Sequence, residues 1–86
     1  MRVQILTPLG TAFDDKAFQV ILPGFDGEFA ILDMHQDCLA SLAAGQVRIQ
    51  RYLPDTKDGI KETVFAVSRG VVKIHLNEVV IMAEPG

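Results

Sequence analysis

The sequence predicts an all-β fold, a flattened β-sandwich or barrel of about 8–10 short antiparallel strands. Apolar and polar residues alternate along most of the chain with the period of a strand, and helical periodicity is almost absent. Turn-forming residues recur at short, regular intervals, which is typical of strands joined by tight connections. Two sheets that face each other would bury the alternate apolar residues from both sides.

The alternation places the strands in order. Val3 and Ile5 share one side of the first strand, and Phe18, Val20 and Leu22 share one side of a later one. The same pattern predicts further strands at residues 28–31, 46–50, 64–67 and 72–76. Residues 79–82 are apolar on both faces, which indicates either a central strand or a strand covered by a partner.

Glycine, proline, asparagine and aspartate separate these strands. Glycine supplies positive φ, proline fixes φ, and Asn or Asp side chains bond to their own turns. The predicted turns lie at residues 8–10, 23–24, 26–27, 44–45, 54–59, 69–70 and 77. The sequence has no internal repeat and no linker, so we expect one domain over residues 1–86.

The composition of the chain argues against several function classes. A net charge of −3 argues against a nucleic-acid partner, because such binding depends on clustered Lys and Arg. The longest unbroken apolar run, residues 79–83, is far shorter than the roughly 20 residues that cross a bilayer. Cys38 is the only cysteine, which suits a reducing compartment. Because the N-terminus also lacks the features of a signal peptide, we expect a cytoplasmic protein.

Acidic residues are concentrated in one part of the chain. Between positions 14 and 37 there are six of them, against a single base, Lys16. This segment has the composition of a negative face that would suit a cationic partner. An ordinary solvated surface explains the same charges equally well.

A search for reactive groups assembles no site. The densest polar cluster, residues 33–38, contains His35 and Cys38, whereas a closed zinc site needs four ligands and the only other imidazole is His75. A nucleophilic cysteine needs a stabilised thiolate and an oriented base, and Cys38 at the start of an apolar stretch fits a small core residue better. We therefore expect no catalytic residue, no metal site and no cofactor.

The most informative stretch is residues 22–32. Two turn signals lie three residues apart, and Phe25 and Phe29 flank the charged Asp26 and Glu28. A tight hairpin whose aromatic rings close the core is one interpretation, and a rigid acidic tip for docking is the other. The pattern alone favours neither.

Several motifs in this order resemble the N-terminal β-sandwich domain of the epsilon subunit of F-type ATP synthases. The matching positions are Val3-Gln4-Ile5-Leu6-Thr7-Pro8, Phe13-Asp14, Pro23-Gly24, Gly27-Glu28-Phe29, Ile31-Leu32, His35, Leu39, Leu42, Gly45, Val47-Arg48-Ile49, Phe65 to Ile74 and Val79 to Ala83. The chain departs from the family pattern where Asp33-Met34 replaces Pro-Gly, Asp37 replaces Pro, and Arg69 replaces the first Gly of a Ser-Gly-Gly hairpin. The resemblance covers nearly the whole chain.

The resemblance implies a non-catalytic rotor subunit of the central stalk. Such a subunit docks the gamma subunit onto the membrane c-ring and couples proton or sodium flow to ATP synthesis. It implies a peripheral position at the cytoplasmic face of the bacterial plasma membrane, held through the complex without insertion into lipid. Members of the family usually continue into a C-terminal helical hairpin. We expect this chain to be a short form without that hairpin, which neither binds ATP tightly nor inhibits ATP hydrolysis.

The resemblance also assigns roles to residues. Gly27, Glu28 and Phe29 match the loop that meets the c-ring, where a carboxylate would pair with Arg. The segment that packs against gamma is matched by His35, Leu39 and Leu42.

Two other readings remain. The chain could be a free-standing all-β carrier or ligand-binding module, although Lys57 lacks the Met neighbours of a biotinyl-type lysine. A minor enzyme alternative rests on His35 and Cys38.

Overall fold

A computed structural model describes residues 1–55 and 57–86, which form eight strands. The strands are β1 (Arg2–Thr7), β2 (Gly10–Lys16), β3 (Gln19–Gly24), β4 (Gly27–Leu32), β5 (Cys38–Leu42), β6 (Gly45–Tyr52), β7 (Ile60–His75) and β8 (Glu78–Pro85). The predicted all-β class is confirmed. In the described part of the chain, no helix is long and apolar enough to cross a membrane.

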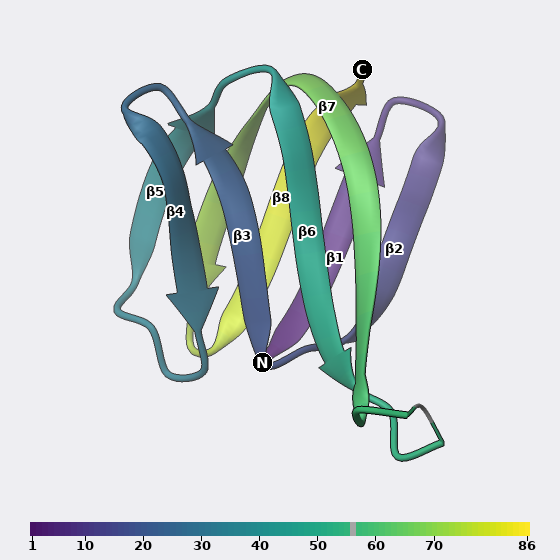
Figure 1. Ribbon diagram of the computed structural model, residues 1–86. Coiled ribbons are helices and arrows are strands. Elements are labelled where there is room, and N and C mark those ends of the chain that lie inside the picture. Colours follow the sequence, from purple (N-terminus) through teal and green to yellow (C-terminus); the bar gives the residue numbers. More distant parts are fainter. Residues whose placement is uncertain (56) are drawn as a thin grey trace.

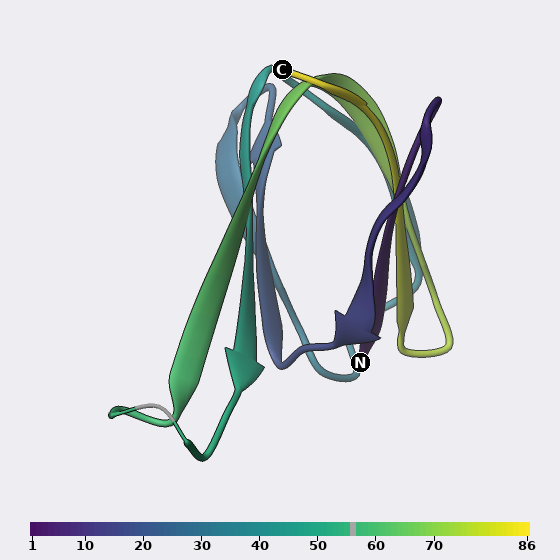
Figure 2. The ribbon, with the colours of Figure 1, turned by 90° about the vertical axis from the view of Figure 1, so that its right-hand side faces the viewer.

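The strands form two layers that face each other (Figures 1 and 2). The first layer contains β4, β3, β6 and the N-terminal half of β7. The second contains β5, the C-terminal half of β7, β8, β1 and β2. Because β7 belongs to both layers, the strands make one continuous sheet with β2 and β4 at its ends, and this sheet does not close into a barrel.

The bend of β7 corrects one predicted turn. Residues 69–70 lie inside this 16-residue strand, where the register with β8 shifts between Val67 and Arg69. Such a shift leaves an extra residue on one strand and increases the local bend, so the chain passes from one layer to the other without reversing. A Cβ at Gly70 would lie 2.7 Å from the Met82 carbonyl oxygen, so glycine is needed here for close approach of β8.

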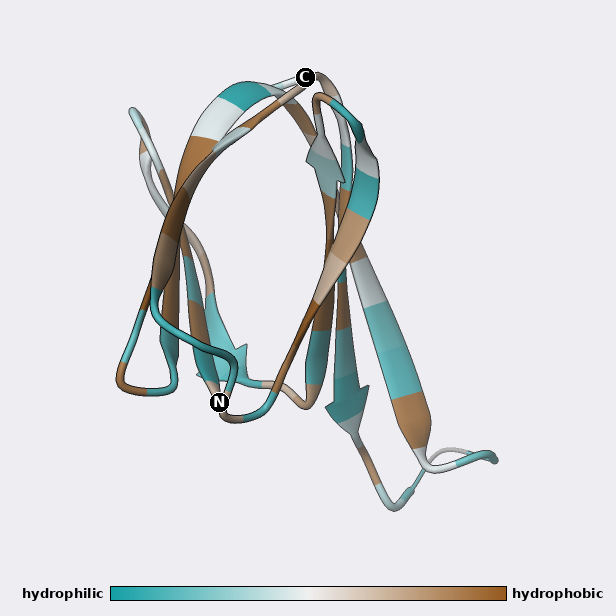
Figure 3. Cartoon of the chain, turned by 90° about the vertical axis from the view of Figure 1, so that its left-hand side faces the viewer, coloured by the Kyte–Doolittle hydropathy of each residue, from teal (hydrophilic) through white to brown (hydrophobic). Residues whose placement is uncertain are grey.

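The predicted alternation accounts for the core. Figure 3 shows hydrophobic and hydrophilic bands alternating along the strands of both layers. The buried apolar side chains between the layers are Val3, Ile5, Ala17, Val20, Leu22, Ile31, Leu42, Val47, Ile49, Val67, Val72, Ile74, Val79, Ile81 and Ala83. The structure supports the central-strand reading of residues 79–82, because β8 lies between β1 and β7. Val79 and Ile81 enter the core, and Met82 is exposed on the outer face.

The pairing of β1 differs from the antiparallel prediction. β1 pairs antiparallel with β2 but parallel with β8, with Val3 opposite Val79 and Ile5 opposite Ile81. This pairing brings the first and last strands of the domain side by side. The N-terminal strand is therefore held inside the sheet rather than at its end.

An ion pair between Arg51 and Asp15 joins the two layers on the side away from β4 and β5. Arg51 of β6 donates to Asp15 of β2 at 2.7 Å, and its guanidinium lies 5.5 Å from the centre of the Phe13 ring. The Lys16 backbone N–H and then Arg51 lower the pKa of the Asp15 carboxyl. This ion pair links β2 and β6, which are not hydrogen-bonded neighbours in the sheet.

Candidate functional site

The β3–β4 hairpin forms a tip at one end of the sandwich. Gly24 pairs with Gly27, and the two residues between them, Phe25 and Asp26, make the turn. Gly27 has a φ of 117°, a region that L side chains rarely adopt, and a Cβ at Gly24 would lie 2.7 Å from the Gly27 carbonyl oxygen. The tip is therefore tight and fixed by its backbone.

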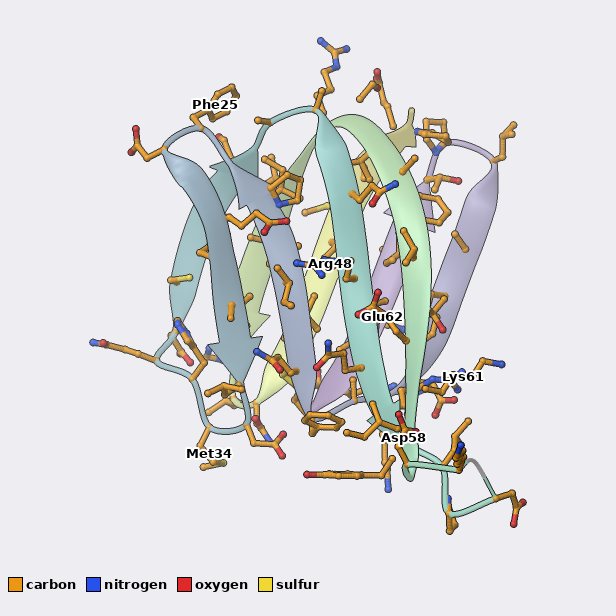
Figure 4. All side chains as sticks on the ribbon, viewed as in Figure 1. Phe25, Met34, Arg48, Asp58, Lys61 and Glu62 are labelled. Atoms are coloured by element: carbon orange, nitrogen blue, oxygen red, sulfur yellow. The ribbon has the colours of Figure 1, made fainter. Side chains whose placement is uncertain are left out.

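The two aromatic residues of the tip have different environments. Phe29 is half-buried and packs against the core, with its ring close to Gly24. Phe25 is 75% exposed at the end of the turn (Figure 4). The interpretation that the rings close the core therefore holds for Phe29 and not for Phe25. Phe25 is a docking candidate that the sequence did not assign, and its only signal was an aromatic residue between two turn glycines.

Glu28 points outward from β4 and is paired within the chain. Its side chain is 61% exposed, and Arg48 of β6 donates to its two carboxylate oxygens at 3.3 and 3.4 Å across the intervening strand β3. Of the three predicted c-ring residues, Glu28 offers a side chain, Gly27 shapes the turn, and Phe29 faces the core. A single Arg48 nitrogen leaves the carboxylate with further acceptor positions for a second cation.

The residues predicted to meet gamma do not share one environment. His35 is half-buried in the connection between β4 and β5, where its Nδ1 lies 2.7 Å from the Gln36 carbonyl oxygen. Leu39 is 70% exposed on β5, opposite Lys73. Leu42 is only 1% exposed and belongs to the core. The side chain of Leu42 points between the layers and away from the surface, because residues three positions apart on a strand, such as Leu39 and Leu42, face opposite sides.

The two candidate docking regions lie at opposite ends of β4. Figure 4 shows Phe25 at one end of the sandwich and Met34 at the other. The six residues of β4 join them, a length of about 17–20 Å for a regular strand. One rigid strand therefore sets the distance between the regions.

An apolar groove of about 580 Å³ runs from the tip across the second layer. Its floor includes one cross-strand row in which Leu6, Met82, Val71 and Ser41 are neighbours on β1, β8, β7 and β5. Phe25 lies on its rim. The apolar outer positions of residues 79–82 were the sequence signal for this surface.

Internal ion pairs neutralise most of the acidic segment. Five of its six acidic residues have a side-chain or terminal partner within the described residues. Four of them pair with a cation, namely Asp14 with Arg2, Asp15 with Arg51, Glu28 with Arg48 and Asp33 with the Met1 α-ammonium, and Asp37 forms a hydrogen bond with His75. The predicted negative face is therefore largely compensated. Asp26 at the tip is the exception among the six.

The polar cluster at residues 33–38 does not assemble a reactive arrangement. His35 and Cys38 share no hydrogen bond in residues 1–55 and 57–86, and Cys38 is half-buried against the core. The same residues hold no group of three or more His, Cys, Asp or Glu side chains placed to bind a metal.

With this geometry established, comparison with known proteins identifies the family. The family model described as "ATP synthase, Delta/Epsilon chain, beta-sandwich domain" matches residues 1–85. The chain belongs to this family. The resemblance inferred from the motifs is confirmed.

Curated relatives agree with this membership. The chain is 38% identical over 74 residues to an ATP synthase epsilon chain of Sulfurovum sp. (strain NBC37-1), covering 86% of the chain and 53% of the relative. It is 34% identical over 84 residues to the ATP synthase epsilon chain of Campylobacter concisus (strain 13826), covering 98% of the chain and 60% of the relative. The chain thus spans little more than half the length of these relatives.

Solved structures share the fold at low identity. A chain in the Tetrahymena thermophila mitochondrial ATP synthase central stalk and c-ring superposes with a TM-score of 0.76 at 21% identity, over 98% of this chain and 63% of that one. A chain in the Euglena gracilis mitochondrial ATP synthase, in a structure of OSCP, F1 and c-ring, gives 0.79 at 16% identity, over 94% and 48%. These likenesses establish the β-sandwich of the family.

Proposed function

We propose that residues 1–86 form the docking domain of an epsilon subunit, a non-catalytic spacer that holds the gamma subunit and the c-ring of a rotary ATP synthase at a fixed separation. The observation that carries the proposal is the placement of the two candidate regions at opposite ends of one strand, β4. The relatives named ATP synthase epsilon chain, and the similar folds in central-stalk and c-ring assemblies, support it.

The tip is the surface proposed to meet the ring. Glu28 is exposed, and its carboxylate retains acceptor positions beyond Arg48, so a ring arginine could add a second charge-assisted hydrogen bond. The two-residue turn next to it carries Asp26 and the exposed ring of Phe25. An aromatic anchor beside a carboxylate has the composition of an interface centre with a polar rim.

The opposite end and the adjoining outer face of β5 are proposed to meet gamma. We propose that His35 and Leu39 contact gamma. Leu42 is not included, because its side chain is buried in the core. The apolar groove lined by Leu6, Val71 and Met82 begins at the tip, with Phe25 on its rim, so it does not belong to this end. Coupling proton or sodium flow to ATP synthesis would then require little slack between the two ends, and tight turns and a continuous sheet supply that rigidity.

The position in the cell follows from the complex. Bound to gamma and the ring, the domain would lie at the cytoplasmic face of the bacterial plasma membrane, attached through protein contacts alone. The experiment that tests the proposal substitutes the tip carboxylate.

Glu28→Lys should weaken association with the c-ring by about tenfold or more, because it replaces an attraction to a cation with a repulsion. The control is Glu62→Lys, which makes the same charge reversal on the outer face of the first layer, where Glu62 accepts a hydrogen bond from Gln50 at 3.1 Å (Figure 4). Ring pull-down of both variants, with thermal unfolding to verify folding, measures the difference. Equal ring binding by the two variants would remove Glu28 from the interface.

One observation favours a ligand-binding module as the second candidate. The volume of the groove lies within the roughly 300–1,000 Å³ range of small-molecule sites, and its lining is mainly apolar. Purification from native membranes distinguishes the two candidate functions. A rotor subunit co-purifies with gamma and the c-ring, whereas a ligand-binding module does not.

A further inference from the structure

The connection between β4 and β5 crosses from the first layer to the second without a strand partner. It comprises residues 33–37, between Leu32 and Cys38. Its own backbone contributes one hydrogen bond, from the His35 N–H to the Leu32 carbonyl oxygen at 3.1 Å. A segment with so few local bonds needs contacts from elsewhere to keep a single conformation.

Those contacts come from the turn between β7 and β8. The Met34 N–H donates to Asn77 Oδ1 at 2.8 Å, and the Leu76 N–H donates to Asp37 Oδ1 at 3.2 Å. His75 Nδ1 lies 2.7 Å from Asp37 Oδ2. Each of the two chain segments thus supplies a side-chain oxygen that binds a backbone N–H of the other.

The backbone at these contacts is unusual. Among the described residues, the non-glycine residues with positive φ are Met34 at 63°, Leu76 at 50° and Asn77 at 61°, and all three take part in this contact. Such conformations persist where the surrounding structure holds them, and they concentrate at functional sites. Here they keep the apolar side chains of Met34 and Leu76 exposed to solvent.

The charges around the contact are mixed. Asp37 faces His75, whose cross-strand neighbour on β8 is Glu78, which in turn lies opposite Arg2 of β1. Lys73 lies on the same side of β7, and Asp33 and His35 lie on the connection itself. The hydrogen bond from His75, followed by that from Leu76, lowers the pKa of the Asp37 carboxyl below its usual range.

We propose that Asp37 and Asn77 are positioning residues, which fix residues 33–37 against the β7–β8 turn and so set the arrangement of Met34 and His35 that the gamma subunit binds. This inference rests on the proposed function. It places the specificity of that interface partly in two side chains that need not touch gamma. It also explains how a connection without the Pro-Gly and Pro of the family pattern is held in one conformation.

The test compares two substitutions at one position. Asn77→Gly keeps a residue that accepts positive φ and removes only the side-chain oxygen, whereas Asn77→Asp keeps both the oxygen and the tolerance of positive φ. We expect Asn77→Gly to weaken gamma binding about fivefold to tenfold, and Asn77→Asp to bind within about twofold of the wild type. Asp37→Ala, which leaves the turn backbone intact, should reproduce the loss.

Amide hydrogen exchange provides a readout that does not depend on gamma. The Met34 amide should exchange faster in Asn77→Gly but not in Asn77→Asp, while core amides such as Ile81 keep their protection. In His75→Gln, the pKa of the Asp37 carboxyl should be higher than in the wild type, because the hydrogen bond from His75 is the main cause that lowers it.

The outcomes separate the two claims. If the wild-type chain binds gamma and Asn77→Gly binds equally well, the positioning role is overturned and the proposed function stands. If the wild-type chain fails to bind gamma, both are overturned. Unchanged exchange of the Met34 amide in Asn77→Gly would also overturn the positioning role.

Discussion

The two ends of the sandwich are built by different means. The tip is a two-residue hairpin whose shape comes from glycines at both of its flanking positions and from regular cross-strand pairing. The opposite end is an irregular connection whose shape comes from side-chain oxygens of Asp37 and Asn77 and from three non-glycine residues with positive φ. One end of the domain is thus fixed by backbone geometry and the other by side-chain hydrogen bonds.

This difference has a consequence for sensitivity to change. A substitution at the surface of the tip alters what a partner meets but leaves the hairpin in place. A substitution of Asp37 or Asn77 instead alters the conformation of neighbouring residues, because each side chain holds the backbone of the other segment.

The two leucines of β5 should differ most. Leu42 lies in the core near the tip, and Leu39 is exposed nearer the connection, so Leu42→Ala should lower the free energy of unfolding by about 2–5 kcal/mol. Leu39→Ala should change it by less than about 0.5 kcal/mol while weakening gamma binding. Urea unfolding and a gamma titration of both variants measure the two effects. Loss of gamma binding from a stably folded Leu42→Ala alone would restore Leu42 to the interface.

Acid should loosen the connection by protonating Asp37. The pKa of Asp37 is lowered in the folded chain, so its contribution to stability is present above the usual Asp value and is lost as pH falls through the lowered value. The Leu76 amide resonance, followed by NMR below about pH 4, should shift with this titration, and Asp37→Asn should abolish the shift. The amide of Ile81 in the core serves as the internal control. A Leu76 shift that persists in Asp37→Asn would assign the transition to another group.

Much of the fold could be predicted from local pattern. Alternation of apolar and polar residues identified the inner faces of β1, β3, β4 and β6, because one side of each strand is buried. It did not reveal β2, which is an edge strand with few buried side chains and therefore has little pattern to show. It also misread residues 69–70 as a turn, since a glycine that permits close approach of β8 is indistinguishable in sequence from a turn glycine.

The candidate site was predicted less completely, for a physical reason. Glu28 and Gly27 belong to a local motif, and the sequence shows such motifs directly. The pairing of Glu28 with Arg48, and the ties of Asp37 and Asn77, join residues 20 to 43 positions apart. The resemblance did not predict the burial of Leu42, because it gives the position of a residue in the chain and not the direction in which its side chain points.

The central claim is that two partners bind at opposite ends of one rigid domain. The most direct test measures the affinity of the chain for gamma with and without a saturating amount of c-ring. The account predicts a ternary complex and a gamma affinity that changes by less than about twofold, since sites that share no residues should not compete. Mutual exclusion of gamma and ring, with either one displacing the other, would contradict the account.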